Sequence, residues 1–184
     1  NLFLNAGPGY GGSCLPKDVK AIINFSTKMG INPTLLTAVE KTNKQQIDNI
    51  LRLAEQNIGK INGKKITILG VAFKPETDDI RDSVSIGLVK RLLKLGAKIT
   101  IHDPKALENA RKIFRDNVKY VKSIPSALKD CQCAIIMTQW KDYESIDNKT
   151  IKRMAKKLII DSRRILSTKN LDAEYYAIGL GQKI

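Results

Sequence analysis

Lys65-Ile66-Thr67-Ile68-Leu69-Gly70-Val71-Ala72 is a β-rich apolar run that ends in a glycine turn and begins a regular alternation of strands and helices. We expect further strands at residues 98–101, 120–121, 133–137, 158–160 and 175–179. Helices are expected between them at residues 85–95, 105–115, 124–129 and 150–155. Because such alternation favours parallel strands covered by helices on both faces, the sequence predicts an α/β fold with a doubly wound, mostly parallel, Rossmann-like sheet.

A first amphipathic helix is expected well before this sheet, at residues 17–29, and Gly30 is expected to end it. Its inward apolar positions are predicted to be Val19, Ile22, Ile23 and Phe25 or Met29.

A much longer helix is expected at residues 33–58, with Asn32 and Pro33 as its N-cap and first turn. About 25 residues at 1.5 Å each would extend roughly 37 Å. A helix of that length must lie against something else, so we expect it to cross between two domains, to pair with its copy in a homodimer, or both. Asn43 falls on its inward apolar stripe, where a polar residue usually indicates a hydrogen bond rather than a ligand contact.

The stretch Gly9-Tyr10-Gly11-Gly12-Ser13-Cys14-Leu15-Pro16-Lys17-Asp18 brings a nucleophile, a cation and a carboxylate together at the start of the first helix. Its glycines permit positive φ and a close approach to a ligand, and Pro16 suits the first helical position. Cys14 then lies beside a helix N-terminus, where free N–H groups and the helix dipole favour a thiolate. Asp18 is close enough to position or deprotonate a water. Most lone cysteines are small buried hydrophobes, but Gly-Gly-Ser before Cys14 and Pro-Lys-Asp after it form a poor core segment.

Composition narrows the choice of partner and compartment. The 184 residues carry a formal net charge of +14, from 32 basic and 18 acidic residues, which makes a polyanion the obvious partner. The lysines are spread over every predicted helix and aromatic residues make up 5% of the chain, so a solvated lysine-rich surface is favoured over nucleic-acid binding. An odd number of cysteines (Cys14, Cys131 and Cys133) without metal-ligand spacing suggests a reducing cytoplasm. No apolar run reaches the roughly 18 residues of a membrane span.

Charged residues follow two predicted strands, at the edge where parallel sheets bind ligands. Where a Rossmann domain would place Gly-x-Gly-x-x-Gly only Gly70 is present, so ordinary dinucleotide binding is not expected there. Lys74 and Arg81 occupy that loop instead and suit phosphates or sugar hydroxyls. Arg163 follows a later strand, and its planar guanidinium can hold a pyrophosphate or carboxylate in a bidentate grip. A solvated loop is the competing interpretation for these charges, and Trp140 is predicted to have a packing role.

Three stretches of the sequence resemble the UDP-glucose 6-dehydrogenase family of nucleotide-sugar dehydrogenases. They are residues 11–18, the Phe-Lys-x-x-Thr-x-Asp-x-Arg-x-Ser arrangement at 73–83, and Asp161-Ser162-Arg163. The resemblance covers the whole chain, with residues 1–60 as the central helical segment and residues 61–184 as the UDP-sugar-binding domain. It implies that the family's N-terminal NAD-binding Rossmann domain is absent here. Because the chain also begins without Met and reaches the cysteine almost at once, we expect it to be a fragment.

The resemblance implies roles for individual residues. Catalysis would use Cys14 as the nucleophile, Asp18 to position water, and Lys17 to hold the thiolate and the developing oxyanion. The substrate would contact Asn5, Tyr10, Gly11, Lys74 and Arg163. The NAD cofactor would contact Cys14, Lys17 and Arg81.

We therefore interpret the chain as part of an enzyme that oxidises UDP-glucose to UDP-glucuronate with two NAD, through a thiohemiacetal and a thioester on the cysteine. It would form a homodimer through the long helix and would be inactive as an isolated fragment. A related UDP-N-acetyl-hexosamine dehydrogenase is a second hypothesis, although Ser13 and the Pro16-Lys17-Asp18 exit favour UDP-glucose. Two hypotheses from different classes stay open, a UDP-sugar-binding module without chemistry and a basic nucleic-acid-binding protein.

Overall fold

The computed structural model of the chain describes residues 5, 7–168 and 171–180. The helices in these parts of the chain are α1 (Leu15–Lys28), α2 (Thr34–Ile58), α3 (Val84–Lys94), α4 (Leu107–Phe114), α5 (Ile124–Leu128) and α6 (Asn148–Ile151). The strands are β1 (Lys65–Leu69), β2 (Lys98–His102), β3 (Lys119–Tyr120), β4 (Cys133–Ile136), β5 (Leu158–Asp161) and β6 (Glu174–Ala177). Two short 3-10 helices, η2 (Arg115–Asn117) and η3 (Lys141–Ser145), were not predicted.

The described strands form one parallel sheet in the order β3-β2-β1-β4-β5-β6. Ile66 of β1 pairs with Ile99 of β2 on one side and with Cys133 of β4 on the other. This is the strand order of dinucleotide-binding Rossmann folds. The first three strands are added toward one edge of the sheet and the next three toward the other, so the switch point lies between β1 and β4. The predicted Rossmann-like α/β fold is confirmed.

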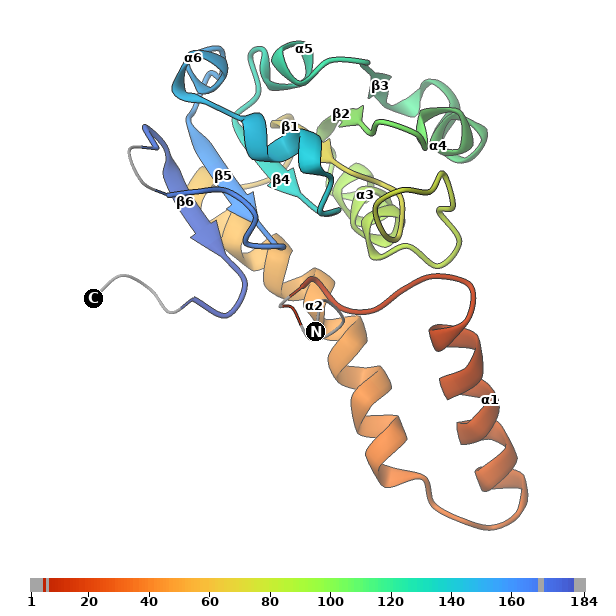
Figure 1. Ribbon diagram of the computed structural model, residues 1–184. Helices are drawn as coiled ribbons and strands as arrows, with labels where there is room; N and C mark the ends of the chain where they lie inside the picture. The colour runs from red at the N-terminus through yellow and green to blue at the C-terminus, as the bar shows by residue number, and fades with distance from the viewer. Residues whose placement is uncertain (1–4, 6, 169–170, 181–184) are drawn as a thin grey trace.

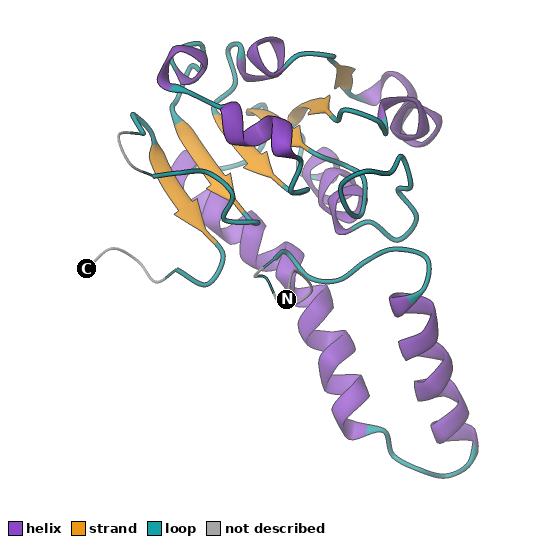
Figure 2. Cartoon of the chain, in the orientation of Figure 1, coloured by secondary structure: helices purple, strands orange, loops and turns teal. Residues whose placement is uncertain are grey.

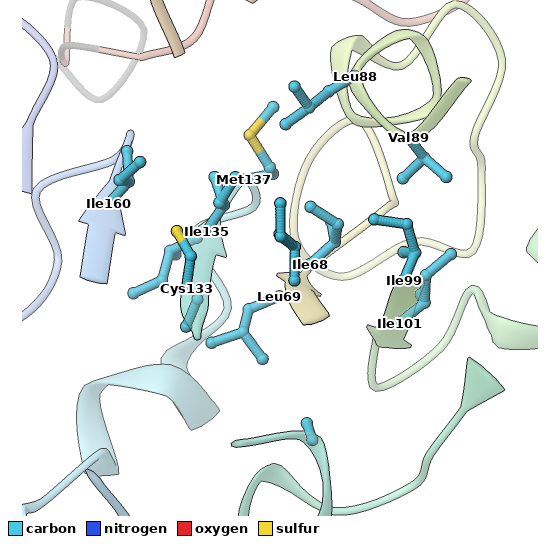
Figure 3. Close-up of a cluster of buried hydrophobic side chains, with 14 of the residues drawn as sticks. Ile68, Leu69, Leu88, Val89, Ile99, Ile101, Cys133, Ile135, Met137 and Ile160 are labelled. Atoms are coloured by element: carbon cyan, nitrogen blue, oxygen red, sulfur yellow. The ribbon is translucent and has the colours of Figure 1, made fainter. Parts of the chain in front are cut away.

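The sheet separates two layers of helices (Figure 2). The Thr67 hydroxyl in β1 donates to the carbonyl of Ala127 in α5 at 2.6 Å, so this side chain faces α5. Because side chains alternate along a strand, Ile68 points to the opposite face. There it joins Leu88 and Val89 of α3 in the apolar core (Figure 3). Burial on both faces explains why β1 reads as a nearly continuous apolar run.

α1 and the first half of α2 form a helical hairpin that extends away from the α/β domain (Figure 1). We predicted that the apolar positions of α1 face inward, but Ile22 is 51%, Phe25 67% and Met29 64% exposed. Leu35 and Val39 of α2 are exposed as well. The prediction is wrong for Ile22, Phe25 and Met29, because the α/β domain covers only the second half of α2 and leaves the hairpin uncovered. Val19 and Ile23 are half-buried.

Two other helix starts differ from the prediction for local reasons. Pro33 is the N-cap of α2 rather than a helical residue, because its ψ of 57° lies outside the helical region, and the helix begins at Thr34. α6 starts and ends earlier than predicted, because the Asp147 carboxylate accepts the N–H of Thr150 at 2.8 Å and caps the helix. Within the described residues, no helix combines the length and apolar character needed to cross a membrane.

The single histidine of the sequence lies buried at the end of β2. The Tyr143 hydroxyl donates to the His102 carbonyl at 3.0 Å and lies 3.1 Å from His102 Nδ1. Burial lowers the pKa of His102 and outweighs the opposing attraction of Asp103. The folded chain therefore favours the neutral imidazole.

We expect the chain to lose stability as the pH falls from about 7.5 to about 5.5, through the pKa near 6.5 of an unfolded histidine. The unfolded chain then accepts a proton that the folded chain resists, which costs up to about 1.4 kcal/mol per pH unit until the lowered folded-state pKa is reached. Thermal unfolding across this range should show the slope in the wild type and a flatter dependence in His102→Gln. Equal slopes in the two proteins would contradict this assignment.

Candidate active site

The loop that carries the cysteine is fixed to α2 by one side chain. Asn43 accepts the N–H of Tyr10 through Oδ1 at 2.7 Å, and its Nδ2 donates to the Tyr10 carbonyl at 2.9 Å. One amide thereby satisfies both backbone groups of Tyr10. The structure confirms the prediction that Asn43 makes a hydrogen bond, and the sequence signal was a polar residue on an apolar helical stripe.

Two glycines allow this loop to lie directly on the α/β domain. Gly12 has φ +92°, and a Cβ at this position would come within 2.7 Å of the Phe73 ring. A side chain at Gly11 would collide with the backbone carbonyl of Asp82. Because Phe73 and Asp82 both belong to the loop between β1 and α3, larger residues at the two glycines would push the cysteine away from the sheet.

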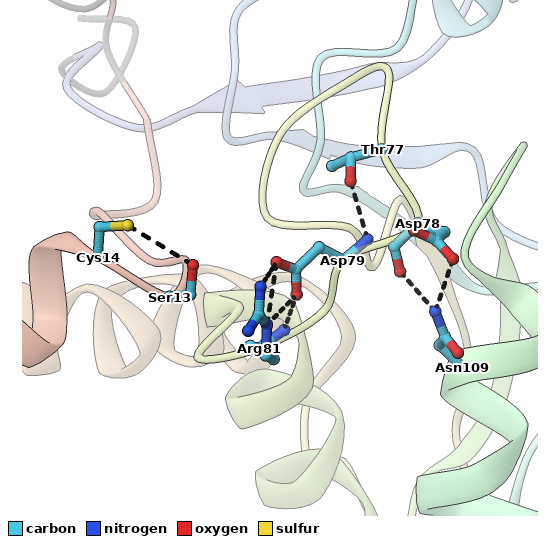
Figure 4. Close-up of polar contacts among 7 residues, drawn as sticks. All are labelled: Ser13, Cys14, Thr77, Asp78, Asp79, Arg81 and Asn109. Atoms are coloured by element: carbon cyan, nitrogen blue, oxygen red, sulfur yellow. Dashed lines mark hydrogen bonds and ion pairs between the residues drawn. The ribbon is translucent and has the colours of Figure 1, made fainter.

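Cys14 is the N-cap of α1 and is exposed. The helix begins at Leu15, two residues earlier than predicted, and the N–H of Asp18 donates to the Cys14 carbonyl at 2.9 Å. Ser13 Oγ lies 3.7 Å from Cys14 Sγ (Figure 4). Lys17 and Asp18 are exposed in the first turn and pair with each other, with Nζ 3.3 Å from Oδ1. A sulfur, an ammonium and a carboxylate therefore share one helical turn.

A cavity of about 580 Å³ lies between this loop and the loops that follow β1, β4 and β5. Its lining is Asn5, Gly7, Gly9, Tyr10, Gly11, Leu15, Val19, Phe73, Lys74, Gln139 and Arg163. The five predicted substrate contacts (Asn5, Tyr10, Gly11, Lys74 and Arg163) are all brought together here. The predicted Cys14, Lys17, Asp18 and Arg81 are not lining residues, although Leu15 places the cysteine directly beside the cavity. Volumes of this size are typical of small-molecule sites.

Arg163 is the half-buried cation of this cavity. Its Nε donates to the carbonyl of Met137 at 2.9 Å, and a Cβ at Gly7 would lie 2.6 Å from its Nη1. Burial lowers the pKa of Arg163, and no carboxylate pairs with it among the residues that the structure describes. Lys74 is exposed on the same lining and also has no ion pair within the described chain. A desolvated guanidinium without a counter-ion favours a bound anion.

Two buried aspartates, whose roles we did not predict, hold the loops at this edge of the sheet. Asp103 accepts hydrogen bonds from the backbone of Val71, Ala72, Lys105 and Ala106 at 2.7 to 3.0 Å and from Trp140 Nε1 at 3.3 Å. Asp161 accepts them from the backbone of Arg163, Ile165 and Leu166 and from the Tyr175 hydroxyl at 2.9 to 3.1 Å. Their position immediately at the end of a buried strand was the available signal, because aspartate commonly accepts from the turn that follows it. Trp140 is buried, as predicted.

The turn after β1 does not fit a dinucleotide. The N–H groups of Val71 and Ala72, where a Rossmann turn would offer donors to a pyrophosphate, are both bound by Asp103. Gly70 has φ +94°, and the Thr138 side chain occupies the space beside it. This geometry is consistent with the absence of the Gly-x-Gly-x-x-Gly pattern from the sequence after β1.

Arg81 lies near the cysteine but is bound within its own loop. Its Nη2 lies 2.7 Å from Asp79 Oδ2 and its Nε 3.0 Å from Oδ1 (Figure 4). The hydrogen bonds with Asp79 raise the pKa of Arg81, and the nearby Cys14 adds a smaller contribution. The same contacts lower the pKa of Asp79. Arg81 is thus within electrostatic reach of the sulfur.

Comparison with known proteins shows that both parts of the chain match domains of one protein family. Residues 1–45 match the central domain of the UDP-glucose/GDP-mannose dehydrogenase family, and residues 67–168 match the UDP binding domain of the same family. The chain belongs to the UDP-glucose/GDP-mannose dehydrogenase family. The resemblance seen in the sequence is confirmed.

Members of this family named as UDP-glucose dehydrogenases are similar over nearly the whole chain. The UDP-glucose 6-dehydrogenase AglM of Haloferax volcanii is 40% identical over 175 residues, which cover 95% of this chain and 40% of that protein. The UDP-glucose 6-dehydrogenase of Rickettsia conorii is 39% identical over 183 residues, which cover 96% of this chain and 42% of that protein. A solved UDP-glucose dehydrogenase from Pyrobaculum islandicum matches with a TM-score of 0.85 at 34% identity, over 94% of this chain and 38% of that one. The chain thus spans about two fifths of the length of these relatives.

We expect Asn43→Ala to loosen the cysteine loop while the fold is kept. Without the side-chain amide, the N–H of Tyr10 loses its acceptor, so its hydrogen exchange should accelerate at least tenfold, which corresponds to about 1.4 kcal/mol. The N–H of Val71, bound by Asp103, should exchange at an unchanged rate. Gln46→Ala is the matched control, because that amide bonds only to the carbonyl of Thr42 in its own helix. Unchanged exchange at Tyr10 would show that Asn43 does not hold the loop.

Proposed function

We propose that this chain supplies the catalytic cysteine and the UDP-sugar site of an enzyme that oxidises UDP-glucose to UDP-glucuronate. The observation that carries the proposal is an exposed Cys14 directly beside a cavity lined by two cations, Lys74 and Arg163, that have no carboxylate partner among the described residues. The names of the similar proteins support UDP-glucose as the substrate.

The two cations suit the pyrophosphate of a nucleotide sugar. Arg163 is half-buried, and its two terminal nitrogens make no hydrogen bond to the residues that the structure describes, so a bidentate contact to phosphate oxygens would compensate its burial. Lys74 is exposed and can follow the position of the ligand. Gly11 and Asn5 line the same cavity and are proposed to contact the sugar.

The reaction requires two oxidations at one carbon, and Cys14 supplies the covalent step between them. NAD is the proposed hydride acceptor in each oxidation. The first converts the C6 alcohol to an aldehyde, to which Cys14 Sγ adds to form a thiohemiacetal. This addition places on C6 an oxyanion that a free aldehyde lacks, and Lys17 is proposed to stabilise it. Loss of the second hydride leaves a thioester, and water positioned by Asp18 hydrolyses it to release the acid and the thiol.

The described residues do not form a cradle for NAD, since Asp103 holds the donors after β1. We propose that Arg81, Cys14 and Lys17 contact the cofactor from one side only. The relatives are more than twice as long as this chain, which allows most of the cofactor site to lie in sequence that these 184 residues do not contain.

We propose a reducing cytoplasm as the location, because Cys14, Cys131 and Cys133 are all free thiols. Burial raises the pKa of Cys131 to about 11, and burial also raises the pKa of Cys133. Neither buried thiol therefore competes with Cys14 as a nucleophile.

In the whole protein that contains this chain, Cys14→Ala should stop formation of UDP-glucuronate. The aldehyde then has no covalent partner, and loss of such a residue commonly lowers the rate by several orders of magnitude. Cys131→Ala and Cys133→Ala are the controls and should leave the rate nearly unchanged. The assay measures UDP-glucuronate from UDP-glucose, with UDP-N-acetylglucosamine in parallel and the UDP-linked aldehyde as a second substrate. Oxidation of that aldehyde by Cys14→Ala at nearly the wild-type rate would exclude Cys14 as the nucleophile.

The 184-residue chain alone should bind UDP and should not reduce NAD. Calorimetry should show that Arg163→Ala weakens UDP binding at least tenfold, or about 1.4 kcal/mol, through loss of a charged contact. Arg91→Ala is the matched control, because Arg91 is exposed, pairs with Asp48 and lines no part of this cavity. Equal affinity in the two variants would show that Arg163 does not bind UDP. NADH formation by the chain alone would contradict the proposal that most of the cofactor site lies outside these 184 residues.

We propose that the helical hairpin forms a homodimer. Phe25, Met29 and Leu35 are exposed apolar residues of the hairpin, which the α/β domain leaves uncovered, and a second copy could bury them. Sedimentation should give a dimer at tens of micromolar, and Phe25→Glu with Leu35→Glu should give a monomer of unchanged helix content. A strict monomer in the wild type would contradict the proposal.

A further inference from the structure

The loop between β1 and α3 carries several residues of the proposed site, and we call residues 73–82 the carrier loop. Phe73 and Lys74, at its beginning, line the cavity beside Cys14. Arg81, near its end, lies within electrostatic reach of Cys14. Residues 73–82 form turns and bends rather than helix or strand. The conformation of the carrier loop therefore depends on individual hydrogen bonds.

Two residues of the carrier loop have backbone conformations that L residues rarely adopt. Glu76 has φ +60° and Asp82 has φ +48°. Conformations of this kind persist where the surrounding structure determines them. The contacts that hold the loop are thus as important to its shape as its own sequence.

Asp79 is the centre of the hydrogen bonds within the carrier loop. Its carbonyl accepts the N–H of Phe73 at 3.0 Å, which fixes the backbone directly before Lys74. Its carboxylate accepts the N–H of Arg81 at 2.9 Å and also pairs with the guanidinium (Figure 4). The position of Asp79 therefore determines how the loop presents both Lys74 and Arg81.

One side chain from outside the loop holds the peptide unit that precedes Asp79. Asn109, in the first turn of α4, donates through Nδ2 to the Asp78 carbonyl at 2.9 Å and lies 3.0 Å from Asp78 Oδ2 (Figure 4). The N–H of the same peptide, which belongs to Asp79, donates to the Thr77 hydroxyl at 3.1 Å. Both polar groups of this peptide are therefore bound. Lys112 donates to Asn109 Oδ1 at 3.0 Å, which is consistent with Nδ2 as the group that faces the loop.

A second polar contact between the loop and the start of α4 is weaker. Lys105 Nζ lies 2.6 Å from Glu76 Oε2, but the two side chains are 48% and 78% exposed. Exposed ion pairs contribute little to stability and are screened by salt. Asn109 is half-buried and bonds to the backbone of the loop itself. It is therefore the contact that constrains the loop more strongly.

We propose that Asn109 is a positioning residue for the reaction proposed above. It contacts neither the substrate nor the cofactor. Through the peptide between Asp78 and Asp79 it keeps Lys74 at the cavity and Arg81 beside Cys14. The proposal rests on the proposed function, in which Lys74 binds the UDP-sugar and Arg81 contacts NAD.

The test compares Asn109→Ala with the wild type in the whole protein that contains this chain. The KM values for UDP-glucose and NAD should each rise at least about threefold, because Lys74 and Arg81 are proposed to bind these ligands before any bond changes, and kcat should change less than about twofold. A merely structural role would lower the apparent kcat, through loss of folded enzyme, and leave both KM values unchanged. Asn49→Ala is the matched control, because that half-buried amide accepts a hydrogen bond from Arg52 of its own helix and lies outside the loop and α4.

A pair of substitutions tests the contact itself. Asn109→Asp places a second carboxylate against that of Asp78 and should raise both KM values more than Asn109→Ala does. Adding Asp78→Asn removes the repulsion and supplies an amide donor to the new carboxylate, so it should recover part of the loss. A double-mutant cycle measures this coupling. Additive effects of the two substitutions would contradict the contact.

Unchanged KM values in Asn109→Ala, or equal changes in Asn49→Ala, would overturn the proposal. Hydrogen exchange in the 184-residue chain separates its failure from that of the proposed function. Faster exchange of the Phe73 N–H in Asn109→Ala supports the hold on the loop, and unchanged exchange overturns it, whether or not the chain binds UDP. The UDP affinities of the wild type and of Arg163→Ala test the proposed function without involving Asn109.

Discussion

The buried carboxylate of Asp103 is the constraint on which the ligand edge of the sheet depends. It accepts five N–H donors and so joins the turn after β1, the start of the segment before α4, and the indole of Trp140 after β4. Hydrogen bonds to a charged group contribute about 1.5–3 kcal/mol each. The same carboxylate accepts the N–H groups of Val71 and Ala72, which an ordinary Rossmann turn would offer to a dinucleotide, and so leaves the edge to a ligand held by side chains instead.

The cysteine reaches this edge through close backbone contact. Gly11 and Gly12 allow the N-terminal loop to lie on Phe73 and Asp82, and Asn43 fixes that loop to α2. Because α2 continues into the core of the α/β domain, Cys14 and the cavity lined by Lys74 and Arg163 are held by one continuous framework. The hairpin beyond this contact has no such support from the domain, and its apolar surface remains open to a partner.

The sequence predicted most of the fold, because buried parallel strands are continuous apolar runs and their helices have clear periodicity. The five residues predicted from three separate parts of the chain (Asn5, Tyr10, Gly11, Lys74 and Arg163) line one cavity, and the hydrogen bond of Asn43 was predictable because it is a polar residue on an apolar stripe. The exposed face of α1 was wrongly predicted, since periodicity shows that a stripe is apolar but not which molecule covers it. Asp103 and Asp161 were not assigned roles, because the number of donors around a carboxylate depends on how several loops meet in space. The start of α6 was missed for a local reason, the cap that Asp147 provides.

Cys14 is proposed to carry the oxidised sugar covalently, and every other catalytic role depends on that bond. The most direct measurement is the mass of the Cys14 peptide after the whole protein with Asp18→Asn is mixed with UDP-glucose and NAD and quenched in acid. Hydrolysis should be slow in this variant, so we predict a UDP-glucuronyl thioester on Cys14 that hydroxylamine removes. NADH formation with an unmodified Cys14 peptide at every time point would contradict it.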